Sequence, residues 1–163
     1  MTQSVIARRN AGGVTYEIDT AKDRLDIGLI HGFLSRCSHW ARGIPRATVE
    51  RSIANSLCFG LYSDGAQIGF ARIISDEATF ACLCDVFVLD GHRGAGLGQF
   101  LVEAILAYEP LQGLRRWHLG TRDAASLYRR CGFADPLGPP ITYLDRVNPD
   151  VYAAMSGKEA AAD

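Results

Sequence analysis

The feature that most constrains the fold is a strand that runs into a glycine-rich turn and then a helix, within residues 86–108. Residues 86–89 are a continuous apolar run, which is typical of a strand buried on both faces of a sheet. The helix begins near Gly98, and its apolar residues recur at helical spacing: Phe100, Leu101, Ala104, Ile105 and Tyr108. Gly94, Gly96 and Gly98 remove β-carbons that would hold a ligand away from the backbone. Because the first turn of a helix has unpaired N–H groups and the positive end of the dipole, the stretch predicts a phosphate site.

Two common phosphate-binding motifs do not fit this turn. A P-loop needs a lysine and then serine or threonine after its last glycine, whereas Gln99 and Phe100 follow Gly98. A dinucleotide fingerprint needs a third glycine in Gly-x-Gly-x-x-Gly, and Gln99 stands at that position. The turn therefore predicts a different phosphate-bearing ligand.

The turn resembles the Arg/Gln-x-x-Gly-x-Gly/Ala signature of the GNAT superfamily of N-acetyltransferases, through Arg93, Gly96 and Gly98. A second stretch, residues 121–133, is similar to the family's Asn-x-x-Ala-x-x-Leu-Tyr-x-x-x-Gly-Phe pattern. The resemblance implies an acyltransferase that uses acetyl-CoA as cosubstrate, with the pyrophosphate lying on the N–H groups of the turn. The cofactor-binding residues that it implies there are Arg93, Gly94, Ala95, Gly96, Leu97 and Gly98.

The length and net charge of the chain limit the class of protein to which it can belong. With 163 residues, 48% of them hydrophobic, the chain is long enough to bury a core of its own. We expect a single domain over residues 1–163, with its core at about 14–146 and frayed ends. The formal net charge of −1 provides no general attraction to nucleic acid or to an anionic membrane. No apolar run reaches the roughly twenty residues of a membrane helix and no signal peptide is apparent, so we expect a cytoplasmic protein without nucleic-acid or membrane partners.

The five cysteines are Cys37, Cys58, Cys82, Cys84 and Cys131. They lack paired C-x-x-C spacing, so reduced thiols are expected. Cys82 and Cys84 share one face of a predicted strand and do not make a plausible zinc site, and no metal is predicted. Direct transfer of an acetyl group to an amine needs no cysteine nucleophile.

The hydrophobic pattern predicts the order strand, two helices, three antiparallel strands, glycine-rich turn, helix, strand, helix and strand. The predicted strands cover residues 14–19, 57–62, 67–74, 78–89, 114–119 and 141–146, and the predicted helices cover residues 25–36, 47–56, 98–108 and 124–131. Residues 1–13 are expected to form a frayed leader, and the tail 153–163 is given no role. Asp64-Gly65 predicts a hairpin turn. Asp123 and Gly132 are expected to cap the two ends of the last helix.

The resemblance implies an α/β (α+β) fold, a single GNAT-type domain whose mixed, mostly antiparallel sheet is splayed between its fourth and fifth strands and flanked by helices. In the family a bulge in the fourth strand opens a slot for the pantetheine arm and frees backbone N–H groups. The resemblance implies that Phe87 or Val88 donates to the thioester carbonyl, and that Val86 and Val88 pair with the pantetheine amides. Thr121 stands where many relatives carry asparagine. Its hydroxyl can donate only one hydrogen bond, so we expect it to make fewer contacts with the cofactor than an asparagine would.

Three further residues have two interpretations each. Tyr128 matches the family's tyrosine and is expected to protonate the leaving thiolate as general acid, although outside the motif it would be taken for a core tyrosine. Asp85 lies inside an apolar run and is either a general base acting through water or a structural acid paired with an arginine such as Arg72. Trp40 either anchors the core or forms the floor of an acceptor pocket, for which Arg72 is the other candidate contact. The remaining candidate bases are Glu77, His31 and His39, beside a water chain with no dedicated base.

The predicted function is direct transfer of the acetyl group of acetyl-CoA to a primary amine of a small molecule. Two alternatives stay open: a non-catalytic acyl-CoA-binding regulatory module, and an acetyltransferase that acts on a protein amine. The acidic residues Asp76, Glu77 and Asp85 near the predicted slot favour a cationic amine. The sequence does not distinguish a monomer from a homodimer.

Overall fold

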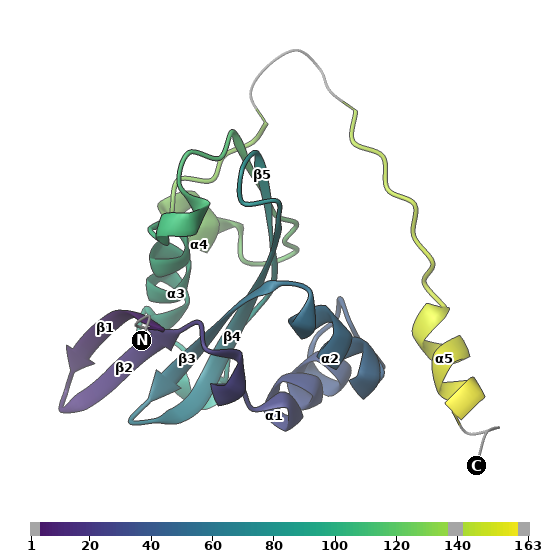
Figure 1. Ribbon diagram of the computed structural model, residues 1–163, viewed down its shortest axis with the longest axis horizontal. Coiled ribbons are helices and arrows are strands. Elements are labelled where there is room, and N and C mark those ends of the chain that lie inside the picture. The colour runs from purple at the N-terminus through teal and green to yellow at the C-terminus, as the bar shows by residue number, and fades with distance from the viewer. Residues whose placement is uncertain (1–3, 137–141, 160–163) are drawn as a thin grey trace. The chain divides into compact units, whose positions relative to one another are not determined.

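The computed structural model describes residues 4–136 and 142–159 (Figure 1). Six strands form one sheet in the order β1-β2-β3-β4-β5-β6. The bounds of the strands are β1 Val5–Ala11, β2 Val14–Asp19, β3 Leu57–Ser63, β4 Ala66–Ser75, β5 Phe80–Val88 and β6 Arg116–His118. Neighbouring strands are antiparallel except for β5 and β6, which are parallel and are joined through α3 (Leu97–Leu106) as a crossover requires. This sheet is the mixed, mostly antiparallel α/β architecture that the sequence predicts.

The N-terminal residues do not form the predicted frayed leader. β1 pairs with β2 over its length, and Gly12 and Gly13 form the turn between the two strands with φ angles of 58° and 80°. Two successive residues with positive φ match the twist of a hairpin, which is why Gly-Gly is a hairpin signal. The prediction was wrong because the charged residues Arg8 and Arg9 obscured the strand, whereas an edge strand readily carries charges.

The central strands lie close to their predicted positions. Asp64 and Gly65 form the predicted hairpin turn between β3 and β4, with φ angles of 45° and 87°. The next turn is closed by Asp76, whose carboxylate accepts hydrogen bonds from the backbone N–H groups of Ala78, Thr79 and Phe80. Only β6, with three residues, is much shorter than its predicted strand.

The helices also follow the predicted order. The first predicted helix is divided into α1 (Ile27–Gly32) and the π-helical turn η2 (Phe33–Cys37), and the others are α2 (Arg46–Ala54), α3 and α4 (Ala125–Arg130). Single turns of 3₁₀ helix are η1 (Lys22–Arg24), η3 (Asp90–His92) and η4 (Glu109–Leu111). No helix in the described part of the chain is both long and apolar enough to cross a membrane.

The C-terminal prediction was wrong. Residues 142–146 form no strand, and residue 141 lies outside the described residues. Leu144 is 88% exposed, unlike an apolar residue on the buried face of a strand. A helix, α5 (Val151–Glu159), instead begins just before the tail to which no structure was assigned.

The buried core lies between one face of the sheet and α3 (Figure 1). Its fully buried members include Phe59, Leu61, Ala71, Ile73, Leu101 and Ile105. The apolar stripe of α3 faces this core, as its helical spacing predicts. Tyr108, just beyond α3, sets its ring edge-on against Phe59 at a centroid distance of 5.3 Å.

By its internal contacts the chain divides into two compact units, each formed from two stretches of sequence. Residues 4–26 and 53–133 form the first unit, which contains the whole sheet, α3 and α4. The described residues of 27–52 and 134–159 form the second. A single domain over the whole chain stays a prediction.

Candidate active site

A β-bulge interrupts the pairing of β4 with β5. Phe70 pairs with Phe87 and Arg72 pairs with Cys84, so Ala71 stands opposite two residues of β5, Asp85 and Val86. Asp85 has a φ of 54°, in the left-handed region that non-glycine residues seldom occupy. The extra residue restores the pattern of burial, because Leu83 and Val88 both face the core although an odd number of positions separates them. The bulge is thus required by the apolar pattern of β5.

The sheet opens on the other side of β5. β6 pairs with β5 only at Phe80↔Arg116, Ala81↔Trp117 and Cys82↔His118. β5 continues past Cys82 to Val88, through the bulge, without β6 beside it. This is the splay between the fourth and fifth predicted strands.

The polar backbone groups of Val88 face this opening. The Leu89 N–H donates to the Ile68 carbonyl at 2.8 Å, and the register places Val88 opposite Gly69. Because alternate residues of an antiparallel strand turn their N–H and C=O groups to opposite sides, those of Val88 point away from β4, while those of Phe87 point toward it. The Val88 carbonyl accepts a hydrogen bond from Arg93 Nε at 3.0 Å. Of the two donors that the sequence leaves open, the alternation favours Val88.

The glycine-rich turn has a backbone that only glycine adopts readily. Gly94 and Gly96 have φ angles of 84° and 70°, and Gly96 is the residue that precedes the first turn of α3. No atom lies within 4 Å of where a Gly94 Cβ would be, so the turn is open above that residue. The Arg93 N–H is already bonded to the Asp90 carbonyl at 3.2 Å. The amides that the helix leaves for a ligand are therefore those after Arg93, including Leu97 and Gly98 in its first turn.

Gly98 has a second role, in packing α4 against α3. A Cβ on Gly98 would lie 3.0 Å from Leu127 Cδ1, closer than side chains normally approach. The absence of that atom lets α4 come close to the first turn of α3. The next residue of α4 is Tyr128, the predicted general acid.

Tyr128 is held by the cap that ends α4. The N–H of Phe133 donates to the Tyr128 carbonyl at 3.1 Å, and the N–H of Gly132 donates to the Arg129 carbonyl at 3.1 Å. Gly132 has a φ of 92°, which confirms the predicted left-handed cap. The Phe133 ring packs edge-on against the Tyr128 ring at 6.0 Å. The motif Tyr-x-x-x-Gly-Phe therefore positions its own tyrosine.

The cap makes a stability prediction. Gly132→Ala is expected to lower the free energy of unfolding by about 1 kcal/mol, because alanine is strained at positive φ. Urea denaturation measures this loss. Gly91→Ala is the matched control, since Gly91 has ordinary φ and no atom within 4 Å of its Cβ position. Equal stability of the two variants would contradict the role given to the cap.

At its other end, α4 begins after Ala124, and no described side chain caps its first turn. The Ala124 N–H donates to Thr121 Oγ1 at 3.0 Å, whereas Asp123 lies beside Arg122 at 3.4 Å. Asp123 is therefore not the cap. The Thr121 hydroxyl keeps its own proton to donate.

Burial raises the pKa of the Tyr128 phenol above its usual value of about 10. Loss of contact with water disfavours the phenolate, and the nearby Cys131 and Asp123 act in the same direction. At neutral pH the hydroxyl therefore holds its proton. This is the protonation state that a general acid needs before the reaction.

Asp85 and Arg72 form a buried ion pair across the bulge. Arg72 Nε lies 2.7 Å from Asp85 Oδ2, and the two side chains are only 15% and 11% exposed. Arg72 Nη1 also donates to Ser56 Oγ at 3.1 Å. This ion pair is the arrangement that the structural interpretation of Asp85 predicts. It also engages the guanidinium of Arg72, which the sequence predicts as a contact of the acceptor.

Two other sets of predicted residues make local contacts. Trp40 is 45% exposed and packs its ring edge-on against His39. Cys82 and Cys84 share a face as predicted, with their sulfur atoms 3.6 Å apart. All five cysteines are free thiols.

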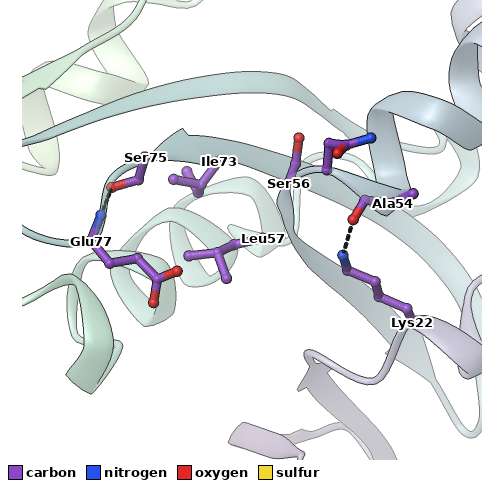
Figure 2. Close-up of a pocket in the computed structure, with 8 residues that line it drawn as sticks. Lys22, Ala54, Ser56, Leu57, Ile73, Ser75 and Glu77 are labelled. Carbon is purple, nitrogen blue, oxygen red and sulfur yellow. Dashed lines mark hydrogen bonds between the residues drawn. The ribbon is translucent and has the colours of Figure 1, made fainter.

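A cavity of about 240 Å³ lies at the start of β3 and the end of β4, at the end of the sheet opposite to the glycine-rich turn. Figure 2 shows Leu57 and Ile73 at its centre, the carboxylate of Glu77 on one side and Lys22 on the other. Lys22 Nζ donates to the Ala54 carbonyl at 3.0 Å. Glu77, one of the candidate bases, thus lines a hollow that is separate from the phosphate end of the site.

Two residues near the site were missed from the sequence. Ser56 accepts the second bond of Arg72, and Arg9 of β1 donates from Nη2 to the Ala95 carbonyl of the glycine-rich turn at 2.8 Å. Arg9 was assigned to the leader, and no local pattern connects it with a turn 86 residues away. The Gly-Gly hairpin signal would have placed it in a strand but not beside this turn.

Known proteins resemble this chain in sequence and fold. The acetyltransferase (GNAT) domain family matches residues 54–135. A GNAT-family protein of Xanthomonas campestris pv. campestris, described as a candidate acetyltransferase, has a crystal structure that is 51% identical, with a TM-score of 0.80, over 85% of this chain and 96% of that one. A Gibberella zeae protein, also a candidate acetyltransferase, is 30% identical over 69% of this chain and 75% of its own length.

Two other similarities cover less of the relative's length or have lower identity. N-alpha-acetyltransferase 80 of Mus musculus is 31% identical over 61% of this chain, which spans 34% of that protein. The structure of AAC(6′)-Iy, in complex with the bisubstrate analogue CoA-S-monomethyl-acetylneamine, shares the fold with a TM-score of 0.56 at 21% identity, over 81% of this chain and 99% of that one. The open edge of β5, the glycine-rich turn and the family match agree, and the chain belongs to the GNAT superfamily and is an acyltransferase.

Proposed function

We propose that this enzyme transfers the acetyl group of acetyl-CoA directly to a primary amine of a small molecule. The observation that carries the proposal is the open edge of β5, which begins after Cys82 and leads to the glycine-rich turn at the start of α3. The family uses acetyl-CoA, which supplies an acetyl group activated as a thioester. The residues fit this cosubstrate, because Gly94 and Gly96 keep the turn open and its first-turn amides lack helical acceptors.

The chain offers a backbone group at each point where acetyl-CoA needs one. The amides from Gly94 to Gly98 would hold the diphosphate, and Thr121 would donate one further hydrogen bond. Val86 and the Val88 carbonyl would pair with the pantetheine amides as an added strand, and that carbonyl would accept a second hydrogen bond beside the one from Arg93. The Val88 N–H, which faces the opening, would donate to the thioester carbonyl and stabilise the negative charge that develops on its oxygen.

Tyr128 would donate the proton that the departing thiolate needs. Its phenol is neutral at physiological pH because burial raises its pKa, and the cap formed by Gly132 and Phe133 fixes the helix end that carries it. The hydroxyl would donate that proton to the departing thiolate as general acid.

Two carboxylates, of Asp85 and Glu77, are candidate acceptors for the proton of the attacking amine, and His31 and His39 stay predicted candidates beside them. Asp85 carries a carboxylate at the bulge but shares it with Arg72, which supports a structural role. Glu77 lines the cavity at the far end of the sheet. A chain of water molecules without a dedicated base is the third route, and Trp40 stays a predicted contact of the acceptor.

A protein N-terminus is the second candidate acceptor. It is favoured by the similarity to N-alpha-acetyltransferase 80, although this chain spans only about a third of that protein. The five free thiols support a reducing, cytoplasmic location, which is part of the proposal.

The proposal is tested by incubating the protein with acetyl-CoA and a panel of acceptors. The panel contains small amines, polyamines, amino sugars, amino acids and peptides with free N-termini. We expect thiol release with a small amine, and a product heavier by one acetyl group in mass spectrometry. The control omits the protein, which measures spontaneous acetylation.

Each other outcome selects an alternative. Faster reaction with the peptides would replace the small-molecule acceptor by a protein amine. Binding of acetyl-CoA, seen as heat in calorimetry, without thiol release on any acceptor would favour a regulatory module. Neither heat nor protection against melting would contradict the proposal altogether.

A further inference from the structure

Arg9 reaches the glycine-rich turn from a distant strand. It lies on β1, at the edge of the sheet, and donates from Nη2 to the Ala95 carbonyl at 2.8 Å. Its Nη1 is the atom closest to the position that a Gly96 Cβ would occupy, at 3.7 Å. The guanidinium therefore lies directly beside the two residues that lead into α3.

The side chain is held there by two aromatic rings. The guanidinium carbon lies 5.0 Å from the ring centroid of Phe100, in α3, and 5.6 Å from that of Tyr16, in β2. Both distances are within the range of cation–π contacts. The charge of Arg9 is thus fixed in place beside the turn, and is not free to move into solvent.

The charge of Arg9 lacks a compensating carboxylate. None of the ion pairs among the described residues includes Arg9, and its Nε is buried without a hydrogen-bond partner among them. The adjacent Arg8, by contrast, pairs with Glu17 at 2.8 Å. The positive end of the α3 dipole adds to the charge of Arg9 at the same place. An uncompensated positive charge of this kind suits an anionic ligand.

We propose that Arg9 is a positioning residue for the diphosphate of acetyl-CoA: it holds the glycine-rich turn through Ala95 and adds a full positive charge beside the first turn of α3. This inference rests on the proposed function and assigns a binding role to the N-terminal hairpin. Pantetheine lacks the diphosphate, so its binding affinity should not depend on Arg9.

The test compares Arg9→Gln with Arg8→Gln. Both remove one positive charge from the same strand, but adjacent strand residues point to opposite faces and only Arg9 contacts the turn. For Arg9→Gln we expect the KM for acetyl-CoA to rise about tenfold, the size of one lost charge-assisted interaction, with kcat within about twofold. Arg8→Gln should leave both constants unchanged.

Two more variants separate charge from packing. Arg9→Lys keeps the charge and should bind CoA within about threefold of the wild type. Arg9→Met keeps an apolar stem between the two rings, and replaces Arg9→Gln if that variant does not fold. Calorimetry with CoA and with pantetheine should show that the neutral variants lose affinity for CoA alone.

The inference is overturned if Arg9→Gln or Arg9→Met binds CoA as tightly as Arg8→Gln does. It is also overturned if the affinity for pantetheine falls in parallel with that for CoA, or if Arg9→Lys binds CoA as weakly as the neutral variants do. The wild type separates this failure from that of the proposed function. A wild type that does not bind acetyl-CoA contradicts the proposed function, whereas a wild type that binds it with Arg9-independent affinity contradicts only the role of Arg9.

Discussion

Tyr128→Phe is expected to lower kcat by roughly one to three orders of magnitude while the Kd for acetyl-CoA stays near the wild-type value. The substitution removes only the hydroxyl, the atom that would protonate the thiolate. The edge-on contact with Phe133 needs only the ring and is retained. Steady-state kinetics and calorimetry measure the two constants separately.

The matched control is Tyr108→Phe. Tyr108 makes a similar edge-on contact, with Phe59 in the core, and its loss of a hydroxyl should leave kcat unchanged. The pH profile adds a second readout. Because the pKa of Tyr128 is raised, the wild-type rate should persist until pH exceeds the ordinary phenol value of about 10 and then fall. An unchanged kcat in Tyr128→Phe would remove this residue from the mechanism.

Asp85→Asn is expected to lower the free energy of unfolding by about 3 kcal/mol. The substitution leaves the buried Arg72 guanidinium without its carboxylate, whereas asparagine tolerates the left-handed backbone of the bulge. Urea denaturation measures the loss. Glu50→Gln is the control, because the Arg46–Glu50 pair is exposed and should contribute under about 1 kcal/mol. Combining Asp85→Asn with Arg72→Met should recover part of the stability, since neither charge of this buried pair then remains.

The same variant separates the two interpretations of Asp85. If Asp85 is the general base, the acid limb of the pH–rate profile shifts in the folded variant. If Asp85 holds the bulge through Arg72, stability falls while that limb stays where it is. Full stability together with an unchanged profile would contradict both roles.

Features set by the backbone of a few successive residues could be predicted from the sequence. The hairpin at Asp64-Gly65, the glycine-rich turn at Gly94 and Gly96, and the cap at Gly132 all follow from positive φ angles that glycine adopts easily. The order of strands and helices from β2 to α4 followed from the spacing of apolar residues. A last strand was also predicted at 141–146, and residues 142–146 do not form it, because strand formation depends on pairing that a short stretch of sequence does not encode.

Only the tertiary structure decided the contacts between residues that are distant in sequence. The sequence alone determined the central strands, the helices between them and the turns, but not the strand at the N-terminus or the helix near the C-terminus, and it identified Tyr128 and the glycine-rich turn through short motifs. The tertiary structure decided where β6 leaves β5, which partner Asp85 takes, and that Arg9 lies beside Ala95. The physical reason is that a turn or cap depends on the φ angles of one or two residues, whereas pairing across strands depends on the packing of the whole sheet.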